Sequence, residues 1–350
     1  MTAPPPGGRL VAVDTLRTLG VLAVLVIHAA PFTHGAGTRL GTAWDAATIA
    51  NQLARFAVPM FFVFAGYFWA RRGDAPDVLA AGARQTVPRL LARFAVWSLV
   101  FLVPFESDRI LRHPPEGFLR NLRASWTWTL DHPGTVLLQG TNGHLWFLMA
   151  LALSVAVIAV LRRWASWRTV LVLGAVCLAA ALLAGPYRRT AAGFTVPFNP
   201  RNGLGFSLFP VALGCWLAGR PVTGRWRTAG LALFAAGALL AVAELTWLRA
   251  HHRTSLAQDL VIGTFAMGVG AALMGLGDAP WLRVPRLAAV GPWVLGLYAA
   301  HPILVDLLTP LAVRLRSPWA DVAELALVAA GTLGLVRLLG RRPATRWLVS

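Results

Sequence analysis

The chain of 350 residues contains no lysine, two cysteines and only 14 acidic residues, against 32 arginines. Cys177 and Cys215 lie in separate apolar runs, which argues against a disulfide framework or a cysteine-ligated metal site. The formal net charge of +18 would suggest nucleic-acid binding in a soluble protein. Here the arginines form short clusters between apolar runs, a pattern typical of membrane-protein loops. The sequence therefore predicts neither a metal site nor a nucleic-acid partner.

Apolar residues, in contrast, are abundant. They make up 57% of the chain, charged residues make up 13%, and the mean hydropathy is +0.62. Apolar runs bounded by arginine, proline or glycine lie near residues 10–32, 47–70, 88–105, 144–161, 167–186, 205–219, 228–248, 256–277, 287–309 and 319–340. A helix needs about 20 mainly apolar residues to span a bilayer. We therefore expect an all-α polytopic membrane protein with about ten transmembrane helices.

The arrangement of these runs also predicts the domain organisation and the orientation. No repeat of about 20 to 50 residues is visible, so residues 1–350 are expected to form a single domain. The first run continues past Ala29 and Ala30, which favours a retained span over a cleaved signal peptide. Cytoplasmic loops are enriched in arginine, and an even number of spans puts both termini on one side. The expected location is the cell membrane, with both termini cytoplasmic.

The first run, LVAVDTLRTLGVLAVLVIHAAPF, carries Asp14, Arg17 and His28 in an otherwise apolar stretch. At about 100° per residue, the step from Arg17 to His28 makes about three turns, and Asp14 lies about 60° from Arg17. An ionisable group at the centre of a span costs about 2.5–3.5 kcal/mol to insert, so a shared face should turn toward a protein interior or a wet cavity. The pattern predicts a central polar cavity. An interfacial Asp14–Arg17 cap with a structural histidine is the alternative.

His28 is the candidate for proton transfer, because the ordinary histidine pKa of about 6.5 lets it take a hydroxyl proton and return it. A transient covalent role would need the same placement. Arg89 and Arg93 lie one turn apart on a helix expected to begin near Pro88, where they would form a two-pronged phosphate clamp. Positive-inside anchoring is the alternative reading of that pair. Arg72 is a further candidate on the same side.

Two later stretches carry candidate substrate-binding residues. GHLWFL places His144 and Trp146 at a helix start, and LYAAHPIL brings Tyr298 and His301 next to Pro302. Proline frees a backbone carbonyl that polar neighbours must satisfy, so a structural role for His301 is the alternative. The long connection 106–143 contains Trp126 and Trp128, which would stack on a sugar-like acceptor or belong to the aromatic belt at the membrane surface.

In order along the chain, VDTLRTLGVLAVLVIHA, FFVFAGYF, PRLLARF, HLWFL and LYAAHPI resemble membrane acyltransferase family 3, whose members acylate hydroxyls of surface carbohydrates and related acceptors. The resemblance covers nearly the whole chain. It implies ten helices and an acyl-coenzyme A donor that enters from the cytoplasm, with acetyl as the default group. Arg17 and His28 match the family's arginine and histidine separated by ten residues, and Arg89 and Arg93 match its cytoplasmic arginine motif. Ala65 stands where the family usually has serine, so any contact from that hydroxyl is absent.

The resulting prediction is a membrane-bound O-acyltransferase in which Arg17 orients acetyl-CoA or another acyl-CoA. His28 then acts on a hydroxyl of a carbohydrate-like acceptor, about 16 Å further along the helix at about 1.5 Å per residue. Asp14 is the third catalytic candidate, and no permanently bound cofactor is expected. The alternative is a transporter of a polar solute that uses Asp14, Arg17 and His28 as a relay. The first run has no second copy, which weakens an inverted-repeat transporter.

Overall fold

The computed structural model describes residues 10–29, 46–107, 116–255, 258–315 and 317–349, and every regular element in these ranges is a helix. The helices are α1 (Val11–Ala29), α2 (Ala46–Ala54), α3 (Ala57–Ala70), α4 (Pro76–Val100), α6 (Glu116–Asp131), α7 (Pro133–Gln139), α8 (Trp146–Leu161), α9 (Trp167–Ala184), α10 (Leu204–Ala218), α11 (Arg225–His252), α12 (Ile262–Leu276), α13 (Pro285–Ala288), α14 (Val294–Leu315), α15 (Pro318–Arg341) and α16 (Pro343–Val349). Three 3-10 turns, η1 (Gly143–Leu145), η2 (Pro280–Leu282) and η3 (Gly291–Trp293), complete them. The predicted all-α class is confirmed.

Seven segments of the described chain are long and apolar enough to cross a membrane. They are Val11–Ala29, Ala47–Ala70, Gly143–Leu161, Trp167–Ala184, Arg225–His252, Pro285–Leu315 and Trp319–Arg341. The helices α10 and α12 are apolar but shorter, and α4 covers the third predicted run without meeting the same criteria. The structure therefore supports a membrane protein, while the count of ten spans stays a prediction.

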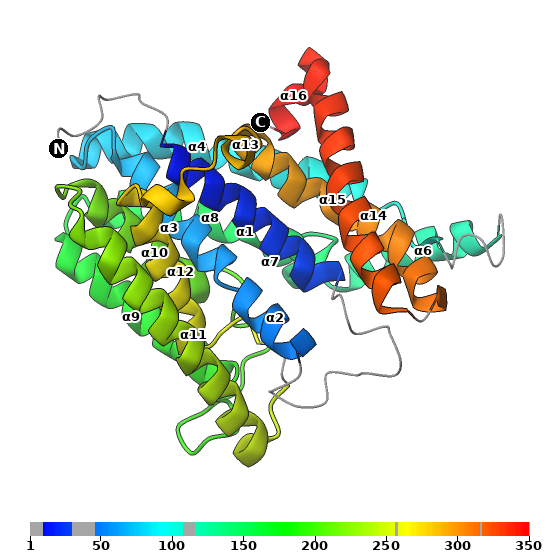
Figure 1. The fold of residues 1–350 in the computed structure, drawn as a ribbon, viewed down its shortest axis with the longest axis horizontal. Coiled ribbons are helices and arrows are strands. Elements are labelled where there is room, and N and C mark those ends of the chain that lie inside the picture. Colours follow the sequence, from blue (N-terminus) through cyan, green and yellow to red (C-terminus); the bar gives the residue numbers. More distant parts are fainter. Residues whose placement is uncertain (1–9, 30–45, 108–115, 256–257, 316, 350) are drawn as a thin grey trace.

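The helix α1 lies in the middle of the molecule (Figure 1), with α9 to α12 on one side and α14 and α15 on the other. Its most apolar stretch is 61% buried inside the protein, whereas those of α9 and α15 are each 22% buried. An apolar helix face that no protein covers is expected to meet lipid. The molecule thus has an inner layer around α1 and an outer layer whose apolar faces point outward.

Polar residues mark several helix starts, as the cap preferences require. Ser166 accepts a hydrogen bond from the backbone N–H of Thr169 at 3.2 Å at the start of α9, and Ser317 accepts one from Trp319 at 3.3 Å at the start of α15. Such side chains satisfy backbone donors that have no partner inside the helix. In η1, Asn142 accepts from the backbone of His144 at 3.4 Å. This cap sets where the GHLWFL stretch turns into a helix.

The helix expected to begin near Pro88 begins at Pro76 instead, and Pro88 lies inside α4. Proline removes one hydrogen bond to the carbonyl four residues earlier, here that of Arg84. Both Arg84 and Pro88 are exposed, so water or headgroups can satisfy that carbonyl. The predicted start was wrong because the proline does not end the helix.

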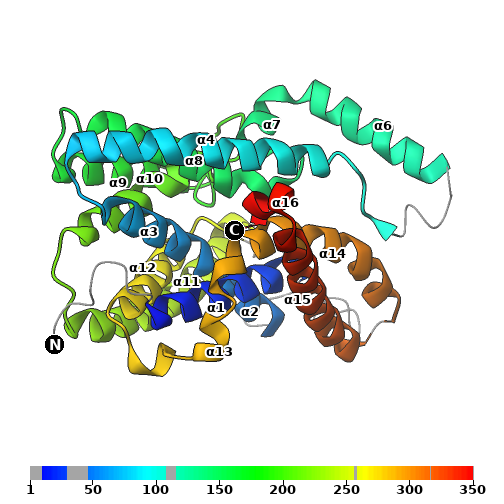
Figure 2. The ribbon, with the colours of Figure 1, turned by 90° about the horizontal axis from the view of Figure 1, so that it is seen from above.

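The second predicted run, 47–70, is divided into α2 and α3 by a turn at Arg55 and Phe56. The long connection contains α6 and α7, and Figure 2 shows α6 extending away from the rest of the molecule while α4 lies along α8. The short helix α16 packs against α14 and α15. None of these three features follows from the apolar runs.

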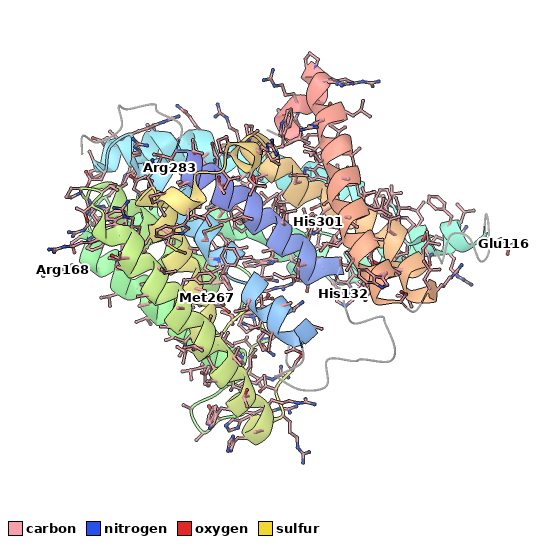
Figure 3. The ribbon with its side chains drawn as sticks, in the orientation of Figure 1. Glu116, His132, Arg168, Met267, Arg283 and His301 are labelled. Carbon is pink, nitrogen blue, oxygen red and sulfur yellow. The ribbon has the colours of Figure 1, made fainter. Side chains whose placement is uncertain are left out.

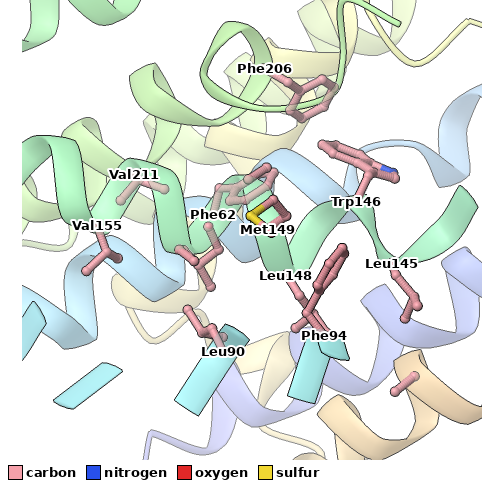
Figure 4. Close-up of a cluster of buried hydrophobic side chains, with 14 of the residues drawn as sticks. Phe62, Leu90, Phe94, Leu145, Trp146, Leu148, Met149, Val155, Phe206 and Val211 are labelled. Carbon is pink, nitrogen blue, oxygen red and sulfur yellow. The ribbon is translucent and has the colours of Figure 1, made fainter. Parts of the chain in front are cut away.

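The core beside α1 is built from large side chains of α3, α4, α8 and α10 (Figure 4). Phe62, Trp146, Phe206 and Met149 are all buried there, and the rings of Trp146 and Phe206 meet edge to face with centroids 5.1 Å apart. Aromatic pairs in this arrangement contribute about 0.5–1.5 kcal/mol beyond their buried area. This cluster supports the helices that carry the candidate site.

The helices α3 and α10 approach closely through two glycines. A Cβ on Gly66 would lie 2.1 Å from the carbonyl oxygen of Val211, and a Cβ on Gly214 would lie 2.1 Å from that of Val63. Small residues at such crossings let two membrane helices pack backbone to backbone. Gly66 in the FAGYF stretch is therefore a packing residue.

Candidate active site

A cavity of about 720 Å³ is bordered by α1, α3, α8 and the start of α14. This volume lies in the range of about 300–1,000 Å³ that is usual for small-molecule sites. Its ionisable lining residues are Arg17, His28, Arg55, His144, Arg201, Asp259 and Tyr298. Trp146, Phe61, Ala65 and Leu151 are among its other lining residues. Apolar and ionisable side chains are thus mixed in the wall of this α1 cavity.

The helix α1 places two of its three ionisable residues in that wall. Arg17 and His28 line the cavity, whereas Asp14 does not and packs against Gly291, where an added Cβ would lie 2.9 Å from the Asp14 Cγ atom. The Nη1 atom of Arg17 is 3.6 Å from Oδ1 of Asp14, and its guanidinium carbon lies 5.6 Å from the ring centroid of Phe68. Asp14 therefore lies behind two residues of the cavity wall, Arg17 and Gly291.

The cytoplasm-facing half expected for α1 is held by hydroxyl contacts to the chain before α14. The hydroxyl of Thr18 donates to the carbonyl of Leu287 at 2.8 Å, and that of Thr15 donates to the carbonyl of Val284 at 3.2 Å. Both carbonyls belong to the α13 region, and such side-chain bonds between segments are effective in a membrane interior. They set the rotation of α1 and hence the direction of Arg17.

Three histidines from three helical segments meet beside the cavity. The ring of His28 lies 4.9 Å from that of His301, and the ring of His301 lies 5.5 Å from that of His144, centroid to centroid. Figure 3 labels His301 beside α1. The His28 side chain is open to the cavity, while those of His144 and His301 are buried. Two predicted substrate-binding residues thus lie next to the predicted base.

Pro302 determines which ring nitrogen of His301 carries the proton. Without an N–H, Pro302 cannot bond the carbonyl of Tyr298, and Nδ1 of His301 lies 2.7 Å from that oxygen instead. A carbonyl only accepts, so Nδ1 carries the proton. The Nε2 atom of His301 is then an acceptor, and it is buried with no hydrogen-bond partner among the described residues. His301 thus presents an unused acceptor within the histidine cluster.

His144 and Tyr298 hold each other in place. Nδ1 of His144 lies 2.9 Å from Oδ1 of Asn142, and its Nε2 lies 3.2 Å from the carbonyl oxygen of Ala299. The hydroxyl of Tyr298 donates to the backbone carbonyl of His144. Both partners are acceptor oxygens, so the one N–H of a neutral ring can donate to only one of them. These contacts on both edges of the ring suit His144 to positioning the η1 turn and α14.

Three lining residues form a charged cluster that sequence reasoning did not identify as a site. Asp259 accepts from Arg55 through one carboxylate oxygen and from Arg201 through the other. The available signal was Arg55, which interrupts an apolar run just as Arg17 does. Arg201 follows α9 in a loop, and no pattern marks it.

Asp259 precedes α12 and lies outside the candidate spans. Burial raises the pKa of its carboxyl, but the positive charges of Arg55 and Arg201 and the hydrogen bond from Arg201 outweigh that effect. The pKa of Asp259 is therefore lower than its ordinary value. The carboxylate is ionised at neutral pH and holds the two guanidinium groups together.

The predicted donor-site arginines lie outside the α1 cavity. The Nε atom of Arg93 donates to the carbonyl of Trp347 in α16 at 2.9 Å, and Arg89 and Arg72 are exposed. Leu90 of the same helix lines the cavity, so α4 borders it between the two arginines. Arg89 and Arg93 are one turn apart as predicted, but the Nε donor of Arg93 is already bonded to α16. The role of the pair as a phosphate clamp stays a prediction.

A second pocket of about 400 Å³ lies under α6. Trp128, Asn121 and Gln139 line it, and Gly143 lines both this pocket and the α1 cavity. The Trp128 ring stacks on the ring of His132 at 5.1 Å, while Trp126 is exposed and does not line the pocket. The long connection between α4 and α8 thus supplies a polar depression that adjoins the histidine cluster.

Buried apolar helices around a cavity with arginine and histidine in its wall define a helical membrane protein with a candidate catalytic site. A family model described as an acyltransferase domain matches residues 10–341. The chain therefore belongs to acyltransferase family 3, and it is a membrane acyltransferase that transfers groups other than aminoacyl groups. The predicted family is confirmed. Neither the curated proteins nor the solved structures contain a match.

Proposed function

We propose that this acyltransferase moves an acyl group, with acetyl as the default, from cytoplasmic acyl-CoA to a hydroxyl of a carbohydrate or related acceptor. The observation that carries the proposal is that α1 places Arg17 and His28 in the wall of one cavity, in a chain of this family. The proposal includes ten spans in the cell membrane, with both termini cytoplasmic. The family match does not favour the transporter alternative.

In the proposed reaction, His28 takes the proton of the acceptor hydroxyl while the hydroxyl oxygen attacks the carbonyl carbon of the thioester. The new C–O bond forms, the C–S bond breaks, and the proton on His28 passes to the leaving thiolate, so the ring ends neutral. The Nε2 acceptor of His301 supports this role, because it suits an N–H from His28 and would leave the other nitrogen of His28 as the base. His301 is then a positioning residue.

Arg17 is proposed to orient the donor. Its side chain is 40% exposed and lines the cavity, whereas its partner Asp14 does not line it. A guanidinium offers planar, paired donors that suit phosphate or carbonyl oxygens. With the N-terminus inside, Arg17 lies toward the donor's side of α1 and His28 toward the acceptor's side. The pocket under α6 adjoins the His28 end and would admit the acceptor.

The test is turnover of radiolabelled acetyl-CoA by the purified protein in detergent, without a membrane gradient. We expect His28→Ala to reduce transfer or donor hydrolysis by about 10²–10⁴-fold, the usual contribution of a general base. His251→Ala is the matched control, because His251 is an exposed histidine at the end of α11. Insertion should survive, since losing a polar group from a span favours it. Near-normal turnover in His28→Ala would remove His28 from the mechanism.

A further inference from the structure

The charged cluster of Arg55, Asp259 and Arg201 joins three distant parts of the chain at the wall of the α1 cavity. The two guanidinium groups share one carboxylate, so the cluster carries one unbalanced positive charge. The other arginine in the wall, Arg17, already has Asp14 as a partner. A charge imbalance in a partly desolvated cavity favours an anionic ligand.

The two arginines differ in how completely they are used. Arg55 donates Nη1 to Asp259 and both Nε and Nη2 to Oδ1 of Asn51, at 3.1 and 2.8 Å. Arg201 donates Nη1 to Asp259, but its Nε is buried and has no hydrogen-bond partner among the described residues. Buried donors without partners are rare in native proteins. The Nε–Nη2 edge of a guanidinium is the edge that binds an oxyanion in a bidentate manner.

Arg201 is also held in a fixed position. Its guanidinium carbon lies 5.4 Å from the ring centroid of Trp146, which lines the same cavity. Its Nη2 atom lies 3.9 Å from the position that a Cβ on Gly143 would take, so Gly143 borders that side of the guanidinium at van der Waals distance. A planar cation that is stacked and tied at one end has little freedom to lose on binding.

The cluster lies at the His28 end of α1. The Nδ2 atom of Asn51, which holds Arg55, donates to the carbonyl of Ile27 at 3.4 Å. Ile27 is adjacent to His28, ten residues from Arg17 along the helix. The unbalanced charge is therefore on the side of the cavity where the acceptor is expected. It is not at the Arg17 end, where the donor is expected.

We propose that Arg201, held by Asp259 and Trp146, is an oxyanion-binding residue for the acceptor, and that the acceptor bears a carboxylate, phosphate or sulfate near the acylated hydroxyl. This inference rests on the proposed function, because it takes His28 as the residue beside the hydroxyl. A purely structural ion pair is the competing explanation for the cluster. The two explanations predict opposite effects of removing Asp259.

The first experiment measures how sulfate shifts the melting temperature of the detergent-solubilised protein, at constant ionic strength with chloride as the replacement ion. We expect sulfate to stabilise the wild type and not Arg201→Gln. Arg189→Gln is the control, because Arg189 is also a loop arginine, and among the described residues it donates to the backbone carbonyls of His252 and Arg253. Asp259→Asn should enhance the sulfate effect by removing the internal competitor. An unchanged sulfate effect in Arg201→Gln, or none in the wild type, would overturn the proposal.

The second experiment separates an acceptor-borne anion from a free one. Binding of glucose, glucuronate and glucose 6-phosphate is compared by calorimetry without any acyl donor. We expect a charged sugar to bind at least about tenfold more tightly than glucose, the scale of one charge-assisted hydrogen bond, and Arg201→Gln to remove the difference. Equal binding of all three sugars would mean that the site takes only a free anion. Acetyl-CoA turnover is measured separately, so failure of the proposed function is distinguishable from failure of this inference.

Discussion

His28 differs from its two neighbouring histidines in what its ring contacts. Both ring nitrogens of His144 have oxygen partners, and Nδ1 of His301 is bonded to the carbonyl of Tyr298. His28 makes no hydrogen bond to the described residues that would compete with a substrate, and its side chain is open to the cavity. Within this cluster, His28 is therefore the histidine whose position suits proton transfer.

A second residue, Arg17, allows a test of whether positive charge alone is sufficient at the donor end of the cavity, through the variant Arg17→Lys. Lysine keeps the positive charge and the pairing with Asp14, but it loses the planar fork that makes two parallel contacts. We expect a loss of at least about tenfold in kcat/KM for acetyl-CoA, corresponding to about 1.4 kcal/mol, with normal expression. Initial rates against donor concentration give the answer. Full activity would show that Arg17 acts only as a charge.

At the scale of the elements, the two arginines of α4 beside α16 are the predicted coenzyme A clamp, and a double variant tests this role. Changing Arg89 and Arg93 together to lysine keeps both positive charges but loses the bidentate contacts that a guanidinium can make. If the pair binds phosphates, the donor's apparent Kd should rise roughly 5- to 150-fold, equivalent to about 1–3 kcal/mol, with little effect on the acceptor. Titration of acetyl-CoA at fixed acceptor measures this.

The matched control for the α4 pair is the double lysine variant of Arg225 and Arg227, at the start of α11 and on the same expected side. An unchanged donor curve in the α4 variant would leave Arg89 and Arg93 as membrane anchors. Their contact with α16 through Arg93 and Trp347 would then be structural. The donor site would have to lie elsewhere in the same region, with Arg72 as the next candidate.

The contact between α3 and α10 gives a stability prediction that does not depend on the chemistry. Gly66→Ala places a methyl group 2.1 Å from a backbone oxygen of α10, so the helices must separate, and we expect a destabilisation of about 1–3 kcal/mol. Gly334→Ala in α15 is the control, because no atom lies within 4 Å of the new Cβ. That change should stabilise the helix by about 0.4–1 kcal/mol. Melting temperatures in detergent that fall equally in both variants would contradict this packing.

For the whole molecule, the Asp259 cluster predicts how stability depends on pH. Its pKa is lower in the folded protein than the ordinary value of about 3.9, so the ionised form stabilises the fold above that pH. As the pH falls below about 4 and through the folded pKa, the carboxylate is protonated and this stabilisation is lost. Comparing melting temperatures of the wild type and Asp259→Asn should show a difference that narrows as the pH falls below about 4. A constant difference would mean that the charge of Asp259 does not stabilise the fold.

The sequence by itself determined the helical membrane class and the common face of Arg17 and His28. Both depend on local quantities, namely the length of apolar runs and the 3.6-residue turn, which hold for any α-helix. The five family stretches likewise appear directly in the residue order. Helix boundaries were less predictable. A proline ends a helix only where the carbonyl that loses its hydrogen bond finds no other partner, and inside α4 Pro88 does not end the helix.

Only the tertiary structure decided which residues share the cavity. Arg55 and Asp259 are 204 residues apart, and His144 and Ala299 are 155 apart, so their contacts depend on how the helices pack against one another. Periodicity within one helix contains no information about its neighbours. The same packing placed Asp14 behind Gly291, so that it does not line the cavity, although its angular position on α1 is close to that of Arg17. The angular position of a side chain around its helix depends on the local sequence alone, whereas its contact partner depends on how the other helices pack.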